Sequence, residues 1–149
     1  MRSGVFVIDS EAKLSFAGAD SQKNKSIPER SVLVACIGAN AGEVAISAIP
    51  AQTNQQINAL ITEFPCFVYH AIKNNTDNFR SMGDGSSTML NVNKTSFENF
   101  PIALPDGIML TDFEDSASEL FSLVLENQME IRKLETTKQL LVSRLSSGN

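Results

Sequence analysis

The C-terminal segment, residues 111–149, places the strongest constraint on the fold of this chain. Apolar or small residues recur there at alternating steps of four and three, which is the pattern of a coiled-coil seam. Two polar residues occupy seam positions, where they can fix the register and the partner of a paired helix. The predicted helix-pairing interface consists of Phe113, Ala117, Leu120, Val124, Asn127, Ile131, Leu134, Lys138, Leu141 and Leu145.

The ends of this predicted helix carry the expected signals. Thr111 followed by Glu114 fits a capping box at the start, while Arg144 and then Gly148 suit a helix end. Such a helix is roughly 50 Å long, which exceeds what one small domain needs internally. We therefore expect a paired helix. The alternative is a helix that lies along its own domain, with the two polar seam residues reaching water.

Residues 1–110 show the alternating strand and helix patterns of a compact mixed-sheet domain. A helix is predicted from Pro65 to Ile72, running towards Phe79, and a turn or short helix over Lys94–Phe100. The fold class is therefore α+β, with one long C-terminal coiled-coil-type helix after the sheet domain. Strands are predicted at Val5–Ile8, Val32–Ile37, Val44–Ile49, Ile57–Ile61 and, at a sheet edge, Phe100–Pro105.

Composition and charge limit the function classes. The chain has 149 residues and a net charge of −5, and residues 1–110 hold 8 basic and 10 acidic residues. This balance argues against a protein that wraps nucleic acid unaided, although a local basic patch remains possible. The sequence shows no membrane-spanning run and no signal-peptide pattern, so we expect a cytoplasmic protein. Cys36 and Cys66 lie in apolar stretches, as expected of reduced core residues.

Enzymatic interpretations find little support in the sequence. There is no phosphate-binding loop, no Gly-x-Gly-x-x-Gly after a strand and no Asn/Asp-Pro-Pro-aromatic methyltransferase motif. Cys66 and His70 could share a helix face as nucleophile and base, but their apolar surroundings favour core packing. A single histidine without a Cys-x-x-Cys pair makes a metal site improbable. We expect a non-catalytic protein without a cofactor or metal of its own.

A polar binding surface is the remaining possibility. Amide side chains can hydrogen-bond base edges in the major groove, and lysine and arginine can contact phosphates. Each such residue alone is more often simply solvated, so only their occurrence together in one small domain indicates DNA binding. The predicted DNA-binding residues are Lys23, Asn24, Lys25, Asn40, Gln52, Asn54, Lys73, Arg80, Ser86, Ser87 and Lys94.

Several of these segments, in this order and spacing, resemble one known family. Ile27–Val34 followed by Gly38–Gly42 resembles the middle of a target recognition domain from the DNA specificity subunit of type I restriction–modification systems. Thr53–Leu60 is similar to the asparagine- and glutamine-containing segment that follows there. The resemblance extends from about Ser21 to Gly148 through Gly85–Thr88, Asn93–Phe97, Pro101–Pro105 and a spacer-like helix containing Leu134, Lys138, Leu140 and Leu141.

This resemblance implies a fold and a function. Such subunits carry two recognition domains, held apart by two antiparallel helices, and each domain reads one half of a bipartite target in double-stranded DNA. The helices also dock the methyltransferase (modification) subunits. The subunit itself is not catalytic, because S-adenosylmethionine binds the modification partner and ATP binds the restriction partner.

The chain departs from that family pattern in two respects. It has one recognition domain, residues 1–110, and one spacer or dimerisation helix, residues 111–149, and the segment before Ser21 looks too short. We therefore expect a half-subunit or a truncated gene product. A half-subunit could pair as a homodimer or with another specificity subunit, and two-fold pairing would predict an inverted-repeat target. The alternative is a protein–protein adaptor or remnant that binds partner subunits without reading DNA.

Overall fold

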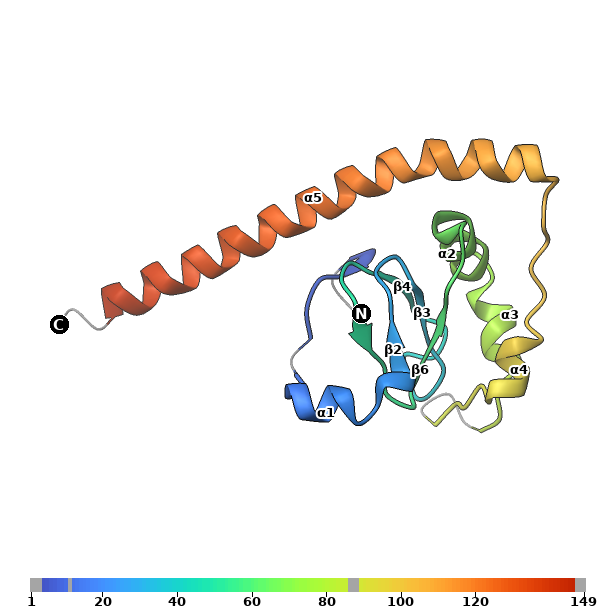
Figure 1. Ribbon diagram of the computed structural model, residues 1–149, viewed down its shortest axis with the longest axis horizontal. Helices are drawn as coiled ribbons and strands as arrows, with labels where there is room; N and C mark the ends of the chain where they lie inside the picture. The colour runs from blue at the N-terminus through green and yellow to red at the C-terminus, as the bar shows by residue number, and fades with distance from the viewer. Residues whose placement is uncertain (1–3, 11, 86–88, 147–149) are drawn as a thin grey trace.

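A four-stranded mixed sheet with helices packed beside it forms the body of the molecule (Figure 1). The computed structural model describes residues 4–10, 12–85 and 89–146. The sheet has the strand order β1-β4-β3-β6, and a second, two-stranded sheet joins β2 to β5. The strands are β1 (Phe6–Val7), β2 (Ser26–Ile27), β3 (Val32–Ala35), β4 (Val44–Ser47), β5 (Ala51–Gln52) and β6 (Ile57–Leu60).

The helices complete the architecture. Five of them are short, and the sixth has 40 residues, which corresponds to about 60 Å. Figure 1 shows this long helix crossing one end of the sheet domain and then projecting beyond it. The helices are α1 (Phe16–Asp20), the 3₁₀ helix η1 (Lys23–Lys25), α2 (Pro65–Lys73), α3 (Thr76–Ser81), α4 (Lys94–Glu98) and α5 (Gly107–Ser146).

The central strands β3 and β4 form the core of the sheet. They pair antiparallel, with Val32 opposite Ile46 and Val34 opposite Val44, and every residue of both strands is buried. A strand buried on both faces is what an uninterrupted apolar run predicts. The strand β1 pairs parallel to β4, and β6 pairs antiparallel to β3. The α+β fold class and four of the five predicted strands are therefore confirmed.

One strand prediction was wrong. The segment Phe100–Pro105 belongs to no strand, since its two prolines lack the backbone N–H that a ladder requires. The polar segment 21–26 contains η1 and the first residue of β2, which pairs with β5.

The start of α5 also differs from the prediction. The helix begins at Gly107, where Asp106 Oδ1 accepts hydrogen bonds from the backbone N–H groups of Ile108 and Met109 at 3.0 and 2.9 Å. The predicted capping box is wrong, because Thr111 lies inside the helix and its hydroxyl donates to the Gly107 carbonyl. Glu114 is buried against the domain instead of turning back along its own helix.

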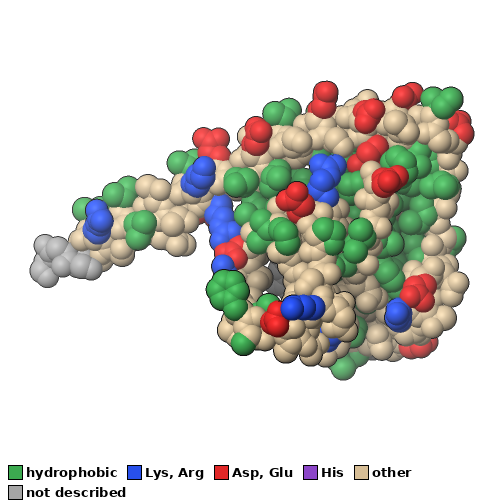
Figure 2. All heavy atoms as spheres, viewed as in Figure 1, with side chains coloured by type: hydrophobic (Ala, Val, Ile, Leu, Met, Phe, Trp, Pro, Cys, Tyr) green, Lys and Arg blue, Asp and Glu red, His purple; other side chains and the backbone are tan. Residues whose placement is uncertain are grey.

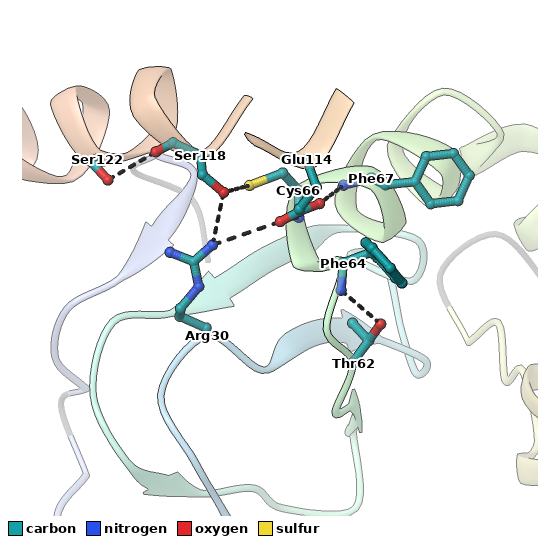
Figure 3. Close-up of polar contacts among 8 residues, drawn as sticks. All are labelled: Arg30, Thr62, Phe64, Cys66, Phe67, Glu114, Ser118 and Ser122. Carbon is teal, nitrogen blue, oxygen red and sulfur yellow. Dashed lines mark hydrogen bonds and ion pairs between the residues drawn. The ribbon is translucent and has the colours of Figure 1, made fainter. Parts of the chain in front are cut away.

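Glu114 joins α5 to α2. Its two carboxylate oxygens accept hydrogen bonds from the backbone N–H groups of Cys66 at 3.1 Å and Phe67 at 3.0 Å (Figure 3). The N-cap residue of α2, Phe64, makes no side-chain capping bond, so Glu114 supplies the cap from another element. Arg30 lies 3.7 Å from the same carboxylate and also donates to Ser118 on α5.

Further along, α5 contacts the edge strand of the sheet. Gln128 accepts a hydrogen bond from the Phe6 N–H at 3.1 Å and donates to the Phe6 carbonyl at 3.3 Å, as a neighbouring strand would. Arg132 forms an ion pair with Asp9. Ion pairing with Lys13 and with Arg132 holds the pKa of the Asp9 carboxyl well below its usual range. These contacts extend the attachment of α5 to its domain by several turns.

The two halves of α5 therefore differ in environment. The domain-facing residues of the first half are Leu110, Glu114, Ala117 and Phe121, while every residue from 129 to 146 is exposed. The alternative that the helix lies along its own domain thus holds for the first half. Ala117 and Val124, two members of the predicted seam, turn towards the domain; Ala117 is 8% exposed.

Replacing Glu114 tests this attachment. Glu114→Ala removes both acceptors and leaves two amide groups unpaired near the core, so we expect a loss of about 2–4 kcal/mol in the free energy of unfolding. Glu114→Gln keeps one acceptor oxygen and should cost less. Urea denaturation followed by circular dichroism measures both values. Glu119→Ala, on the exposed side of α5, is the control, with an expected change within about 0.5 kcal/mol.

Candidate nucleic-acid interface

The sheet has one end beside α5 and one end remote from it. The strand β3 starts next to α5, where Arg30 contacts Glu114 and Ser118, and it runs away from that helix towards the turn Gly38–Gly42. The segment between β5 and β6 reaches the same remote end, because the Cys36 N–H donates to the Gln56 carbonyl at 2.8 Å. Two polar turns therefore meet there.

Two further segments join this remote end. Ile37 and Asp84 each form an isolated bridge with Asn91, which brings the described parts of the 83–91 segment beside β3. The Thr76 hydroxyl lies 3.4 Å from the Gly42 carbonyl, which places the start of α3 against the turn. We call three segments, residues 38–42, 53–56 and the described parts of 83–91, the distal end. The 74–76 segment borders it at Thr76, but Asn74 and Asn75 line a groove beside Met109 and Phe113 of α5. Figure 1 shows the 83–91 segment on the side away from α5.

Four of the predicted DNA-binding residues are exposed and have no ion pair among the described residues. Asn40 lies in the turn between β3 and β4, and Lys73 in the last turn of α2, next to the distal end. Asn24 and Lys25 lie in η1, just before β2. Side chains in these positions can contact a ligand without first breaking an ion pair.

Asn54 is exposed and partly engaged. Its Oδ1 accepts a hydrogen bond from the Gln56 N–H at 3.0 Å, which closes an Asx turn. The side-chain NH₂ group is then left to donate outward. An amide held in this way can donate a hydrogen bond from a fixed position, so little side-chain conformational entropy is lost when it binds a ligand.

Two other predicted residues support the fold. Gln52 donates to the Ala19 carbonyl at 2.8 Å and to the Ser26 hydroxyl at 2.9 Å, so it joins α1 to the β2–β5 sheet. Arg80 donates to the carbonyls of Ala39 and Ala41, at 3.2 and 2.7 Å, and so holds the turn between β3 and β4. Neither structural role could be predicted from the sequence, because most of the partners are backbone carbonyl oxygens distant along the chain.

The remaining predicted residues are less available. Lys23 pairs with Asp20 at 2.6 Å and Lys94 with Glu98 at 3.5 Å. Both pairs have the three- or four-residue spacing of helical neighbours, so the sequence could have indicated them. Such exposed pairs are weak, and a phosphate could replace the carboxylate. Ser86 and Ser87 lie outside the described residues.

The charge of α5 bears on which surface could face a nucleic acid. Residues 107–130 contain six acidic residues and no Lys or Arg. Figure 2 shows acidic side chains spaced along the edge of the molecule where α5 lies. Phosphates are repelled by such an edge. The distal end, which carries the exposed amides of Asn40 and Asn54 and has Lys73 next to it, is the more suitable surface.

The buried thiols and the histidine belong to the core. Burial, together with the neighbouring Glu114 carboxylate, raises the pKa of the Cys66 thiol to about 11, and burial also raises the pKa of Cys36. The His70 ring packs edge-on against Tyr69, Phe113 and Phe121. A thiol this hard to ionise is a poor nucleophile.

The described residues offer neither a metal site nor a membrane-spanning helix. No three His, Cys, Asp or Glu side chains there lie close enough together to hold a metal ion. Within the same residues, none of the helices combines the length and apolar character needed to cross a membrane.

Comparison with protein families decides the classification. Residues 7–108 match the family described as the type I restriction modification DNA specificity domain. The chain belongs to this family. The match covers the whole sheet domain from β1 to the first residues of α5. The resemblance noted in the sequence is thereby confirmed.

Individual relatives agree with this assignment. The chain is 33% identical to the type I restriction enzyme HindI specificity subunit of Haemophilus influenzae, over 99% of this chain and 33% of that protein. It therefore spans about a third of the length of this curated relative. The fold is similar to the crystal structure of a type I restriction–modification S subunit from M. genitalium, with a TM-score of 0.56 and 17% identity over 74% of this chain and 30% of that chain.

The burial of both thiols gives a direct test of this part of the structure. We expect neither cysteine to react with Ellman's reagent in the native protein at pH 8, since both thiols are buried and protonated. Both should react within minutes in 6 M guanidinium chloride, a condition in which about two thiols per chain are counted. Rapid reaction of Cys66 in the native state would contradict the packing of α2 against α5, and rapid reaction of Cys36 would contradict its burial beside β3.

Proposed function

We propose that the sheet domain is a recognition domain that reads one half of a bipartite target in double-stranded DNA, and that α5 forms the spacer helix. The observation that carries this proposal is the exposure of Asn40 and Asn54 at the distal end, with Lys73 next to it, in a domain that matches the DNA specificity family. Asn40 and Asn54 would contact base edges, and Lys25 and Lys73 would contact phosphates.

We further propose that α5 docks the methyltransferase subunit of a type I complex, which acts in the cytoplasm together with a restriction subunit. The exposed apolar residues on the projecting half of α5 support such docking, because a helix without a partner would leave them in water. The same helix would pair with a second copy or with another specificity subunit. In that assembly the modification partner binds S-adenosylmethionine, and the partners also supply positive charge around the DNA.

Methylation mapping tests the proposed function. The chain is expressed in a host with the cognate methyltransferase, and modified adenines are located by long-read sequencing with and without the chain. We expect a methylated bipartite motif that appears only when the chain is present. If the methyltransferase co-purifies with the chain and yet no motif appears, the DNA-reading proposal is wrong.

Point variants of these four residues should separate contacts to base edges from contacts to phosphates. Asn40→Ala and Asn54→Asp should relax discrimination at one base position by about 1–3 kcal/mol each, and the Asp side chain keeps the Oδ1 acceptor that closes the turn. Lys25→Ala and Lys73→Ala should weaken binding to all sequences and lower the salt slope by about one each.

Competition binding of the assembled complex to labelled DNA, at several salt concentrations, measures both quantities. Lys13→Ala is the control, because Lys13 is an exposed lysine that pairs with Asp9 near α5 rather than at the distal end. An equal effect of Lys13→Ala would show that net charge alone determines affinity.

A second candidate function is an adaptor that binds partner subunits without reading DNA. It is favoured by one observation: of the predicted phosphate contacts, Lys23 and Lys94 are ion-paired and Arg80 supports a turn. Under this proposal, replacing Lys25 and Lys73 together would change neither the methylation pattern nor the composition of the complex.

A further inference from the structure

Phe16, the first residue of α1, is the most exposed large apolar side chain among the described residues. It is 98% exposed, whereas the next most exposed phenylalanine, Phe113, is 40% exposed. Single exposed aliphatic residues are ordinary on a protein surface. An aromatic ring is different, because it can bury a larger apolar area than most side chains and here buries almost none. The ring is therefore available for a contact outside its own domain.

The helix that carries this ring is held in place although none of its residues is buried. At its start, the Ser15 hydroxyl accepts a hydrogen bond from the Gly18 N–H at 3.1 Å, which is a regular N-cap. At its end, Gln52 donates to the Ala19 carbonyl at 2.8 Å and so ties α1 to β5. A helix that is capped and tied down but adds nothing to the core is suited to presenting a side chain from a fixed position.

The neighbours of Phe16 in α1 are small. Ala17, Gly18 and Ala19 follow it, and all three leave room for another molecule to approach the helix backbone closely. Leu14, which is 62% exposed, lies over Gly18, since a Cβ built on that glycine would be 3.9 Å from the Leu14 side chain. The surface is therefore a small apolar projection rather than a groove.

The helix α1 lies on the side of the domain proposed to read DNA. Gln52, which ties α1 to the sheet, ends β5, and the residues that follow it, 53–56, belong to the distal end. Figure 1 shows α1 and the 83–91 segment on the side of the sheet domain away from the first half of α5. A duplex bound at the distal end would therefore have α1 beside it.

Charge indicates which kind of ligand this projection fits. Residues 13–25 contain three lysines and one aspartate, in a chain with a net charge of −5. Lys25 is exposed and has no ion pair among the described residues, and Lys23 pairs only with the exposed Asp20. Lysines attract phosphates, and an aromatic ring stacks on flat apolar faces. Duplex DNA offers both, because charged backbones flank its stacked bases.

We propose that Phe16 is a wedge that inserts between two neighbouring base pairs of the target duplex, while Lys23 and Lys25 bind the phosphates beside that step. This inference rests on the proposed function and adds stacking to the contacts with base edges and phosphates. Apolar wedges unstack a base step and kink the duplex, and pyrimidine–purine steps deform most easily. Phe16 would thus select a flexible step without forming a hydrogen bond to any base.

Tryptophan fluorescence of the full chain tests the wedge without a partner subunit or a known target. The chain contains no tryptophan, so Phe16→Trp introduces a single fluorophore at this position. On addition of sonicated double-stranded DNA at low salt, we expect its emission to be quenched and its accessibility to acrylamide to fall, because the indole ring stacks between bases. The control is Leu104→Trp, since Leu104 is 72% exposed and precedes α5; neither property should change there. If the tryptophan at position 16 stays as accessible as the control, the proposal is wrong.

Binding of the assembled complex to its mapped target separates a wedge from a phosphate contact. Phe16→Ala should weaken binding by about tenfold, the order expected for the loss of one base–aromatic stack, and Phe16→Leu should keep most of the affinity. Phe16→Ala should leave the salt slope unchanged, whereas Lys25→Ala should lower it by about one. With 2-aminopurine in place of successive adenines, fluorescence should rise at one step with the wild-type chain and not with Phe16→Ala.

The outcomes distinguish this proposal from the proposed function. Because the ring is exposed, each variant should keep the melting temperature of the wild-type chain, which confirms folding. If the wild-type complex methylates its motif and Phe16→Ala binds that motif equally well, the wedge is wrong and the proposed function stands. If no motif appears with the wild-type chain, the proposed function is wrong, and the tryptophan measurement decides the wedge by itself. Loss of the methyltransferase from the Phe16→Ala complex would assign the ring to a protein contact and overturn the wedge.

Discussion

The carboxylate of Glu114 accepts hydrogen bonds from the first two free amides of α2, at 3.1 and 3.0 Å, and this contact fixes the long helix on its domain. The amides need an acceptor, because the N-cap residue of α2 supplies none. The contact also determines which side of α5 faces inward. Leu110, Ala117 and Phe121 lie on the same side of α5 as Glu114 and are buried against the domain. The adjacent face of α5 is exposed.

That single orientation separates two functions in space. The sheet begins beside α5 at Arg30 and ends, one strand length later, at the turns of the distal end. The exposed amides of Asn40 and Asn54 lie at the distal end, with Lys73 next to it, whereas the acidic half of α5 lies at the other end of the sheet. A domain built in this way can present one end to a nucleic acid and keep its helix available for protein partners.

The sequence predicted what depends on local pattern. The apolar run Val32–Ile37 predicted a strand that is buried on both faces, and the heptad spacing predicted the long helix. It could not predict which face of α5 turns inward, because Ala117 fits a pairing seam as well as a domain contact. Nor could it assign Glu114, whose partners lie almost 50 residues away in the chain. For the candidate site it found exposed Asn40 and Lys73, but it could not separate them from Gln52 and Arg80, which bond to distant backbone.

Amide hydrogen exchange of the assembled complex, with and without its methylated target DNA, tests the central claim most directly. The account predicts that DNA slows exchange in residues 38–42 and 53–56 and leaves exchange in residues 129–146 of α5 unchanged. Protection confined to α5, with no change at the distal end, would contradict it.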